Sequence, residues 1–444
     1  MDSTAPPTAP RLAPLTGTKD SLPALSATRW QVMSTLRALY SSWGYAPVEV
    51  PAIEPYDPTH PAAARAFKLV DGSDVLMLRA DFTPSISRLI QAQEAGLRPT
   101  AAIKAGSPQL ISPEVASSID KPPNEGNAFV DDLQSTGVYR YQYSGALWQA
   151  HTPTIINPRE FTQIGLELIG SASTRADVEL IHLARESVRA VGLVPRVDLG
   201  NPGLIRKLLD LAGIPKADQE RVATTIDRKD VAGLSSLLEP YTLAPDLRNA
   251  LLATPDLYGG VDVLDRAHKL MPWPDVADDV RHFEAVIAEF EDVSELHIDL
   301  AMARRLDYYT GITFRAYTTE SAQPLLGGGR YDGALLPHAA GFALGLERVV
   351  TVLPHVYAEA PLVVSNDDVA ARRLRAAGYS VSRALATSPT SLRAEAVVMD
   401  VPFVLMNGQL EAVKELTPEL ENLQHALQVS LNADTPDENT TASI

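Results

Sequence analysis

The sequence predicts an α+β protein, in which long antiparallel strands form a core and helices interrupt the strand order. Alternating apolar residues predict two strands of one sheet, at about 141–148 and 160–169. Helical stripes of apolar residues stand before and after this pair, at about 26–43 and 178–188. Long antiparallel strands with helices set between them are typical of the α+β class.

The composition is that of a soluble globular protein. The chain has 444 residues, of which 45% are hydrophobic and 21% charged, so a largely disordered chain is excluded. This length suits about two to four domains. No apolar run approaches the ~18 residues of a membrane-spanning helix. Residues 1–7 have neither the basic nor the apolar region of a secretory signal, and we expect a cytoplasmic protein.

The absence of cysteine, the spacing of the histidines and the net charge exclude or disfavour several classes of function. The chain has no cysteine, which excludes disulfides, cysteine zinc sites, iron–sulfur clusters and thiol catalysis. His151, His182, His268 and His297 lack the spacing of metal ligands, and we expect neither a metal nor a cofactor. With 38 basic and 55 acidic residues the net charge is −17, which argues against nucleic-acid binding.

Composition and pattern predict the order of the chain. A small α/β unit is expected near its end, and a largely helical insertion is expected to interrupt the core. The predicted parts are a flexible arm (1–16), a core in two pieces (17–195 and 293–355) with an inserted loop (101–136), a helical insertion (196–292), the α/β unit (361–425) and a flexible tail (431–444).

Individual elements follow from local signals. Gly44 is a suitable end for the helix that begins near residue 26. Residues 75–78 predict a buried strand, and Thr83-Pro84 resembles a helix N-cap followed by proline at the first helical position. Strands are expected again at 296–302 and 312–317.

The strand at 160–169 is the most informative segment. Its apolar residues Ile164, Leu166 and Leu168 share one face, while Gln163, Gly165 and Glu167 share the other. Two polar groups beside a glycine leave a gap in which a ligand can lie, with oxygens that accept from an ammonium or an imidazole N–H. An ordinary solvent-exposed sheet face would give the same pattern.

Three further segments leave a similar choice open. Asp81 and Thr83 stand at a strand-to-helix junction and either face a ligand or cap the helix. Residues 304–309 (RRLDYY) have two possible roles. In one, an arginine binds a ligand carboxylate and one of the two tyrosines presents its hydroxyl; in the other, the tyrosines are a packed aromatic pair beside a surface ion pair. Gly327-Gly328-Gly329 indicates a tight turn or a close backbone approach, as either a hairpin turn or a ligand-facing loop, and lacks the P-loop spacing.

Taken in order, these segments resemble the histidyl-tRNA synthetase branch of the class II aminoacyl-tRNA synthetases. The resemblance covers residues 17 to about 353. It is carried by GTKDSLP (17–23), GYAPVEVP (44–51), RYQYSGALWQ (140–149), REFTQIGLELIG (159–170), RRLDYYTGITF (304–314), GGGRYDG (327–333) and GFALGLERVV (341–350). It implies a class II synthetase-like antiparallel sheet flanked by helices.

The resemblance also implies a histidine-binding pocket. By position, Asp81, Thr83 and Gln163 would meet the ligand's α-ammonium. Glu167 and Tyr309 would meet the imidazole. Tyr308 would line the pocket, and Arg304 would face the carboxylate. Asp81 stands where these synthetases usually carry a glutamate.

The chain departs from the synthetases where ATP is activated. The second-motif arginine that would hold the α-phosphate aligns with Gln149, and the next two charged positions align with His151 and Thr152. Arg348 keeps the arginine of the third motif. Residues 361–444 carry six basic and eleven acidic side chains, a net charge of −5, which is a poor surface for tRNA.

This combination resembles the synthetase-like paralogues that serve as regulatory subunits of ATP phosphoribosyltransferase. The resemblance implies a non-catalytic, allosteric chain of the first step of histidine biosynthesis. It would form a homodimer within a hetero-octamer, activate a short catalytic subunit and mediate feedback inhibition by histidine. It implies no tRNA and no membrane. Two rivals stay open, a divergent histidyl-tRNA synthetase that adenylates histidine, and a module for another amino acid or for dimerisation alone.

Overall fold

The computed structural model describes residues 13–95, 137–154, 157–303, 308–354 and 361–432, and the chain forms two compact units, Met1–His355 and Val356–Ile444. Most of the predicted arm and tail, the inserted loop at 101–136 and the segment before the second unit lie outside the described residues. The predicted boundaries of the arm, insertion and tail stay predictions. Among the described helices, none is long and apolar enough to cross a membrane.

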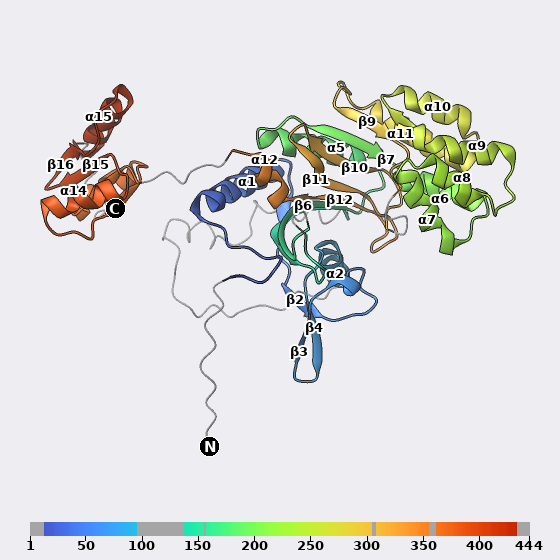
Figure 1. The fold of residues 1–444 in the computed structure, drawn as a ribbon, viewed down its shortest axis with the longest axis horizontal. Coiled ribbons are helices and arrows are strands. Elements are labelled where there is room, and N and C mark those ends of the chain that lie inside the picture. The colour runs from blue at the N-terminus through green and yellow to red at the C-terminus, as the bar shows by residue number, and fades with distance from the viewer. Residues whose placement is uncertain (1–12, 96–136, 155–156, 304–307, 355–360, 433–444) are drawn as a thin grey trace, which may run out of the picture. The chain divides into compact units, whose positions relative to one another are not determined.

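A nine-stranded sheet dominates the first unit (Figure 1). It confirms the predicted α+β class, because most neighbouring strands are antiparallel and only the β1–β5 and β7–β9 pairs are parallel. In spatial order the strands are β1 (Ala46–Pro47), β5 (Tyr139–Trp148), β6 (Glu160–Ile169), β12 (Ala339–Gly345), β11 (Ser321–Arg330), β10 (Thr313–Thr318), β7 (Arg196–Gly200), β9 (Leu296–Asp299) and β8 (Tyr258–Gly259).

Helices α1 (Pro23–Ser42), α5 (Thr174–Ala190) and α12 (Leu346–Val352) pack on the sheet. The buried positions of α1 repeat at four-residue steps, Val32, Leu36 and Tyr40, as the stripe in the sequence predicts. The helix begins at Pro23, before the expected residue 26. It ends just before Gly44, whose positive φ of 81° turns the chain back toward β1.

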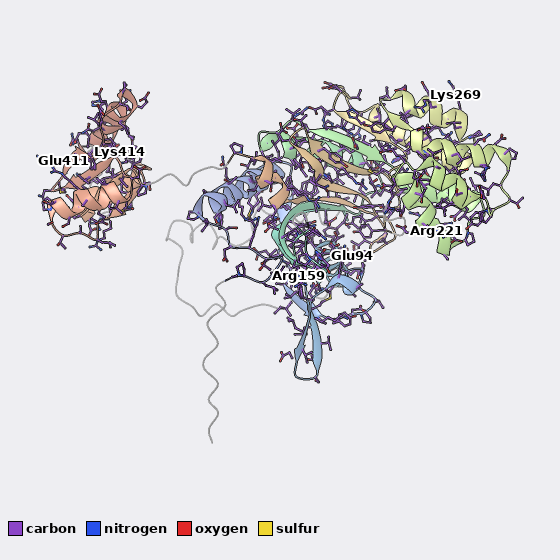
Figure 2. The ribbon with its side chains drawn as sticks, viewed as in Figure 1. Glu94, Arg159, Arg221, Lys269, Glu411 and Lys414 are labelled. Atoms are coloured by element: carbon purple, nitrogen blue, oxygen red, sulfur yellow. The ribbon has the colours of Figure 1, made fainter. Side chains whose placement is uncertain are left out.

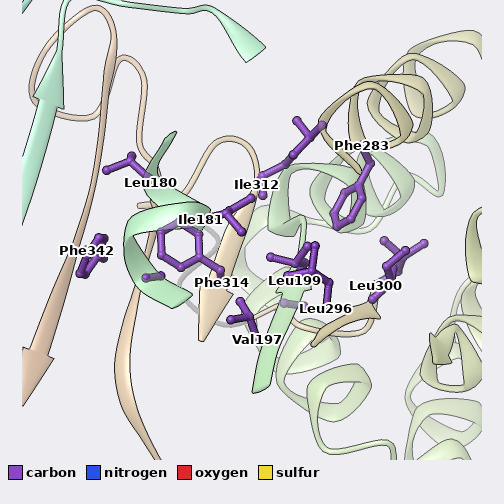
Figure 3. Close-up of a cluster of buried hydrophobic side chains, with 14 of the residues drawn as sticks. Leu180, Ile181, Val197, Leu199, Phe283, Leu296, Leu300, Ile312, Phe314 and Phe342 are labelled. Carbon is purple, nitrogen blue, oxygen red and sulfur yellow. The ribbon is translucent and has the colours of Figure 1, made fainter. Parts of the chain in front are cut away.

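The segment 196–292 is largely helical but begins with β7, which belongs to the central sheet. Its helices are α6 (Pro202–Leu211), α7 (Lys216–Asp227), α8 (Val231–Leu238), α9 (Pro245–Ala253), α10 (Asp262–Leu270) and α11 (Pro274–Ile287), with a 3₁₀ turn η2 (Thr254–Asp256). Figure 3 shows how Phe283 of α11 and Leu199 of β7 lie in the same apolar cluster. One hydrophobic core therefore continues from the sheet into these helices.

A small three-stranded sheet, β2 (Ile53–Pro55), β4 (Asp74–Leu78) and β3 (Lys68–Asp71), lies between α1 and α2 (Thr83–Glu94) in the chain. A 3₁₀ turn, η1 (Ala63–Arg65), precedes β3. The prediction of a buried strand at 75–78 is wrong in its burial. Met77 is buried, but Val75 is exposed, because apolar residues pack only against the end of the β3–β4 hairpin that is farther from its turn.

The second unit has a four-stranded sheet, in the order β14 (Val381–Arg383), β13 (Val363–Ser365), β15 (Phe403–Met406) and β16 (Gln409–Ala412). Its helices are α13 (Asp368–Ala376), α14 (Pro389–Val398) and α15 (Pro418–Asn432). Helix α15 runs past residue 425, where the sequence places the end of this unit. Leu427 and Leu431 of this helix are buried against the sheet.

Gly327-Gly328-Gly329 lies inside strand β11, so the prediction of a hairpin turn is wrong and the close backbone approach is what the structure has. A Cβ atom on Gly328 would stand 2.1 Å from the carbonyl oxygen of Gly341 and 2.4 Å from the Cβ of Phe342. Glycine is required there because β11 and β12 come too close for any side chain.

We therefore expect Gly328→Ala to destabilise the first unit by about 1–3 kcal/mol or more, the range typical of overpacking. The matched control is Gly327→Ala, one residue earlier on the strand. Its Cβ would make ordinary contacts, the nearest at 3.6 Å from the carbonyl oxygen of Phe314. Urea unfolding curves of the two variants check this, and equal midpoints would contradict it.

Candidate functional site

The candidate site lies on the glycine-lined face of the central sheet. The alternation predicted for β6 is confirmed, since Ile164, Leu166 and Leu168 are buried in the main core, while Gln163 and Glu167 line a cavity of about 290 Å³. Across the sheet, Glu167 stands beside Gly341 and Gly165 stands beside Ala343. Small residues on the neighbouring strand therefore leave room above the sheet for a ligand.

Glu167 is the buried centre of the site. Only 2% of its surface is exposed, so it does not lie on a solvated sheet face, the alternative that the sequence left open. Its Oε1 accepts a hydrogen bond from the Thr83 hydroxyl at 2.7 Å, and its Oε2 accepts one from the Tyr331 hydroxyl at 2.5 Å. Burial raises the pKa of Glu167 from 4.5 to about 8, although both hydrogen bonds favour the charged form.

The glycines around Glu167 make its position possible. A Cβ on Gly341 would stand 2.2 Å from Oε2 of Glu167, and a Cβ on Gly165 would stand 2.3 Å from the hydroxyl oxygen of Tyr143. Any side chain at either position would displace one of these groups. The backbone of two neighbouring strands thus fixes where the carboxylate and the tyrosine lie.

Asp81 and Thr83 reach the cavity from the junction between β4 and α2. Thr83 does not cap the helix, as one interpretation of the sequence held, because its hydroxyl bonds to Glu167 and Phe82 occupies the cap position. Asp81 takes part of the capping role, since its Oδ1 accepts a hydrogen bond from the Thr83 backbone N–H at 3.2 Å. The other carboxylate oxygen, Oδ2, lies 3.3 Å from the guanidinium of Arg65.

Aromatic side chains form a wall of the cavity. Tyr308 stacks on Tyr331 with ring centroids 5.2 Å apart and meets Tyr309 edge-on at 5.0 Å. The sequence singled out Tyr308 and Tyr309 but missed Tyr331 and Tyr143, which also line the cavity. Burial raises the pKa of Tyr331 well above its usual value, and so does the nearby Glu167, so this hydroxyl remains a donor.

Gln163 lines both this cavity and a second one of about 580 Å³. Arg348 and Ala343 also belong to both, so the two cavities share a boundary. Among the described residues, the charged side chains around the second cavity are Lys19, Arg348, Glu320 and Glu347. Glu347 is already paired with Arg29 at 2.7 Å.

The positions that align with the ATP-activating motif make local contacts. Gln149 lines the second cavity, and its Nε2 donates to the carbonyl oxygen of Ala80 at 3.2 Å. His151 Nε2 lies 3.0 Å from the carbonyl oxygen of Asn157. Thr152 is exposed and does not line either cavity. Arg348 donates to the carbonyl oxygen of Pro324 at 2.9 Å.

Arg304, expected to face a carboxylate, lies outside the described residues. Within the part of the chain that is described, no group of three or more histidine, aspartate or glutamate side chains is placed to hold a metal ion.

Comparison with known proteins adds an independent line of evidence. A family model described as histidyl-tRNA synthetase matches residues 17–118 and 114–349. The ATP phosphoribosyltransferase regulatory subunit of Thermus thermophilus is 38% identical over 364 residues, which cover 80% of this chain and 88% of that protein. The protein of the same name from Deinococcus radiodurans is 36% identical over 383 residues, which cover 85% and 84%.

Solved structures agree on the fold. A regulatory subunit/histidyl-tRNA synthetase from Bacillus halodurans superposes with a TM-score of 0.70 at 22% identity, over 90% of this chain and 99% of that one. A histidyl-tRNA synthetase from a Nostoc species gives a TM-score of 0.70 at 17% identity, over 95% and 100%. The predicted class II synthetase-like fold is therefore confirmed.

The raised pKa of Glu167 predicts how stability depends on pH. The folded chain holds this proton more tightly than the unfolded chain does, so its free energy of unfolding falls as the pH rises from about 4.5 to about 8. We expect wild type to lose about 3 kcal/mol relative to Glu167→Gln between pH 5.5 and 8.5.

Chemical denaturation of both proteins at several pH values checks this. Glu160→Gln, at the exposed end of the same strand, serves as the control and is expected to follow wild type. Parallel curves for wild type and Glu167→Gln would contradict the assignment.

Proposed function

This chain belongs to the family of ATP phosphoribosyltransferase regulatory subunits and shares the histidyl-tRNA synthetase fold, and on that premise we propose that it senses L-histidine. In this proposal it is a non-catalytic homodimer within a hetero-octamer. It activates a short catalytic subunit and carries the feedback inhibition of the first step of histidine biosynthesis. Neither tRNA nor a membrane takes part.

The buried Glu167 in the first cavity is the observation that carries the proposal. Its carboxyl group can share a proton with an imidazole nitrogen, and Asp81 at the rim can pair with an ammonium group. The tyrosine wall supplies a flat aromatic surface on which a ring can lie. A histidine molecule offers partners for each of these groups.

The proposed mechanism is allosteric. Histidine would bind one arrangement of the dimer, or of its contacts with the catalytic subunits, more tightly than another. A useful response needs a coupling free energy of typically ~1–3 kcal/mol. Side chains from the β4–α2 junction and from the residue after β11 meet Glu167 of β6, so a ligand bound to Glu167 would link segments far apart in the chain.

The charge of the second cavity weighs against amino-acid activation. Its described lining carries Lys19 and Arg348 beside the carboxylates of Glu320 and Glu347, and the neutral Gln149 stands where the second-motif arginine would hold the α-phosphate. Stabilising a triphosphate during adenylation depends on a surplus of positive charge, and one such contact is worth about 3–4 kcal/mol. This supports a chain that binds histidine without activating it.

The rival function is a divergent histidyl-tRNA synthetase. Arg348 favours it, because this side chain lines both cavities and so reaches the place where a nucleotide would meet the amino acid. The acidic second unit opposes it, since a net charge of −5 over residues 361–444 repels the tRNA backbone.

Removing the central carboxylate tests the pocket. We expect Glu167→Ala to weaken histidine binding at least tenfold, because it deletes a buried group that bonds the ligand. Assembly with the catalytic subunit should be unchanged. Glu94→Ala, at the exposed end of α2 (Figure 2), is the control and should bind as wild type does. Calorimetry measures the affinities, and equal histidine affinity in Glu167→Ala would refute the pocket.

Reconstitution tests the regulatory role. Phosphoribosyl-ATP formation by a short catalytic subunit from the same source should rise when this chain is added and fall when histidine follows. Histidine-dependent ATP–pyrophosphate exchange by this chain alone should be absent. Exchange above background would establish the rival synthetase, and no change in transferase activity on mixing would overturn the proposal.

A further inference from the structure

Helix α14 stands alone on one face of the four-stranded sheet in the second unit. Its inward side chains, Leu392 and Ala396, are fully buried against strand residues such as Val404. Helices α13 and α15 contact each other and pack on the opposite face, where Leu405 is buried. Within the described part of this unit, no second helix packs on the α14 side of the sheet.

The outward face of α14 is apolar as well. By helical spacing from Leu392 and Ala396, the side chains of Ala394, Val397 and Val398 point away from the sheet, and all three are exposed. A helix that is apolar on both sides is normally buried on both sides. This unit therefore has a helix face that is suited to packing and has no described element of the unit against it.

Leu385 extends this apolar face. Its backbone N–H donates a hydrogen bond to the Glu395 carboxylate at 3.0 Å, and Glu395 lies one helical turn before Val398. Among the described residues, Leu385 and Val398 are the most exposed large apolar side chains, at 89% and 87%. Leu385, Ala394, Val397 and Val398 are called the α14 patch below.

Opposite charges stand at the two ends of the α14 patch. Arg393 lies at its start and Asp400 just beyond the end of the helix, two helical turns later, so both lie along the same side of the patch. Each is exposed and is paired within its own chain, Arg393 with Glu411 and Asp400 with Lys414 (Figure 2). Exposed pairs of this kind are weak, so both charges can take a second partner.

This order of charges is complementary to itself. When two copies of a helix pack antiparallel about a twofold axis, the start of each helix lies against the end of the other. Arg393 of one copy then meets Asp400 of the other copy, once on each side of Val397. Alanine and valine are small enough for the helix axes to approach to about 8–10 Å. A second copy of this chain therefore fits the α14 patch in both apolarity and charge.

The α14 patch is too small to hold two free chains together. A stable interface typically takes about 800 Å² from each partner, or roughly 20–30 residues. The four residues of the patch and the two charged residues beside them are far fewer. The contact is therefore expected between copies that another interface already joins, because their effective concentration is high.

We propose that α14 of one copy packs antiparallel on α14 of a second copy, through the α14 patch and two ion pairs between Arg393 and Asp400. The inference rests on the homodimer of the proposed function and adds a second contact between its subunits. It gives the second unit a role in assembly. It does not depend on histidine binding.

A chemical cross-link tests the contact, because the chain has no cysteine of its own. In the full chain, Val397→Cys places a single thiol in the α14 patch. A short bismaleimide should link two copies of this variant at least about tenfold faster than two copies of Val369→Cys. Val369 is the matched control, since it is an exposed valine on α13, across the sheet from α14.

Charge reversal tests the antiparallel arrangement. In the Val397→Cys chain, Arg393→Asp alone or Asp400→Arg alone should slow the cross-link about fivefold, because each places like charges together at both ends. Both changes together restore opposite charges between copies, and the rate should recover. The double change still breaks the pairs with Glu411 and Lys414 inside each chain, so recovery cannot arise within one copy.

Sedimentation of the unmodified chain separates the outcomes. If the chain is a homodimer and Val397→Cys cross-links no faster than Val369→Cys, this inference is overturned and the proposed function stands. Cross-linking that does not respond to the charge reversals also overturns it. So does protection of the Val397→Cys thiol by added catalytic subunit without any cross-link, which would assign the patch to that subunit. A monomeric chain would contradict the proposed homodimer, and this inference with it.

Discussion

The arrangement of this site depends on the buried carboxyl group of Glu167, which lies on one face of the central sheet. Glu167 leaves water on folding, which is unfavourable for its charged form and raises its pKa to about 8. Its carboxylate accepts hydrogen bonds from hydroxyl groups at the start of α2 and in the residue that follows β11. Glycine at 341 leaves the space into which its Oε2 fits. The sheet, the helix junction and the aromatic wall are thus tied together at one side chain.

The two cavities differ in electrostatics in a way that bears on function. The first is lined by two carboxyl groups, Asp81 and Glu167, and by two arginines, Arg315 and Arg348, and this balance of charges suits a small zwitterion. The second is lined by Lys19 and Arg348, by Glu320 and Glu347, and by the neutral Gln149 where the second-motif arginine would stand. Membership of the regulatory-subunit family and the absence of an arginine at position 149 support the same interpretation, that the chain keeps a ligand pocket without the chemistry of activation.

The spacing of apolar residues predicted the structure well for those helices and strands that bury one face. The two long strands β5 and β6, the helix α1 and the split of β6 into a core face and a cavity face all follow from spacing. The glycine content of Gly327-Gly328-Gly329 is typical of a turn, but these residues lie inside a strand. The sequence around Thr83 is typical of a helix cap, but the Thr83 hydroxyl instead donates a hydrogen bond to Glu167, a residue 84 positions away.

The sequence by itself determined the fold class, the order of the elements and which side chains of β6 leave the core, because these depend on local pattern. Only the tertiary structure decided that Glu167 is buried, that Tyr331 and Tyr143 join it, and that Thr313 lines the same cavity from three strands away. Those facts depend on the register between strands distant in the chain. Register is set by packing across the whole sheet, which local spacing does not encode.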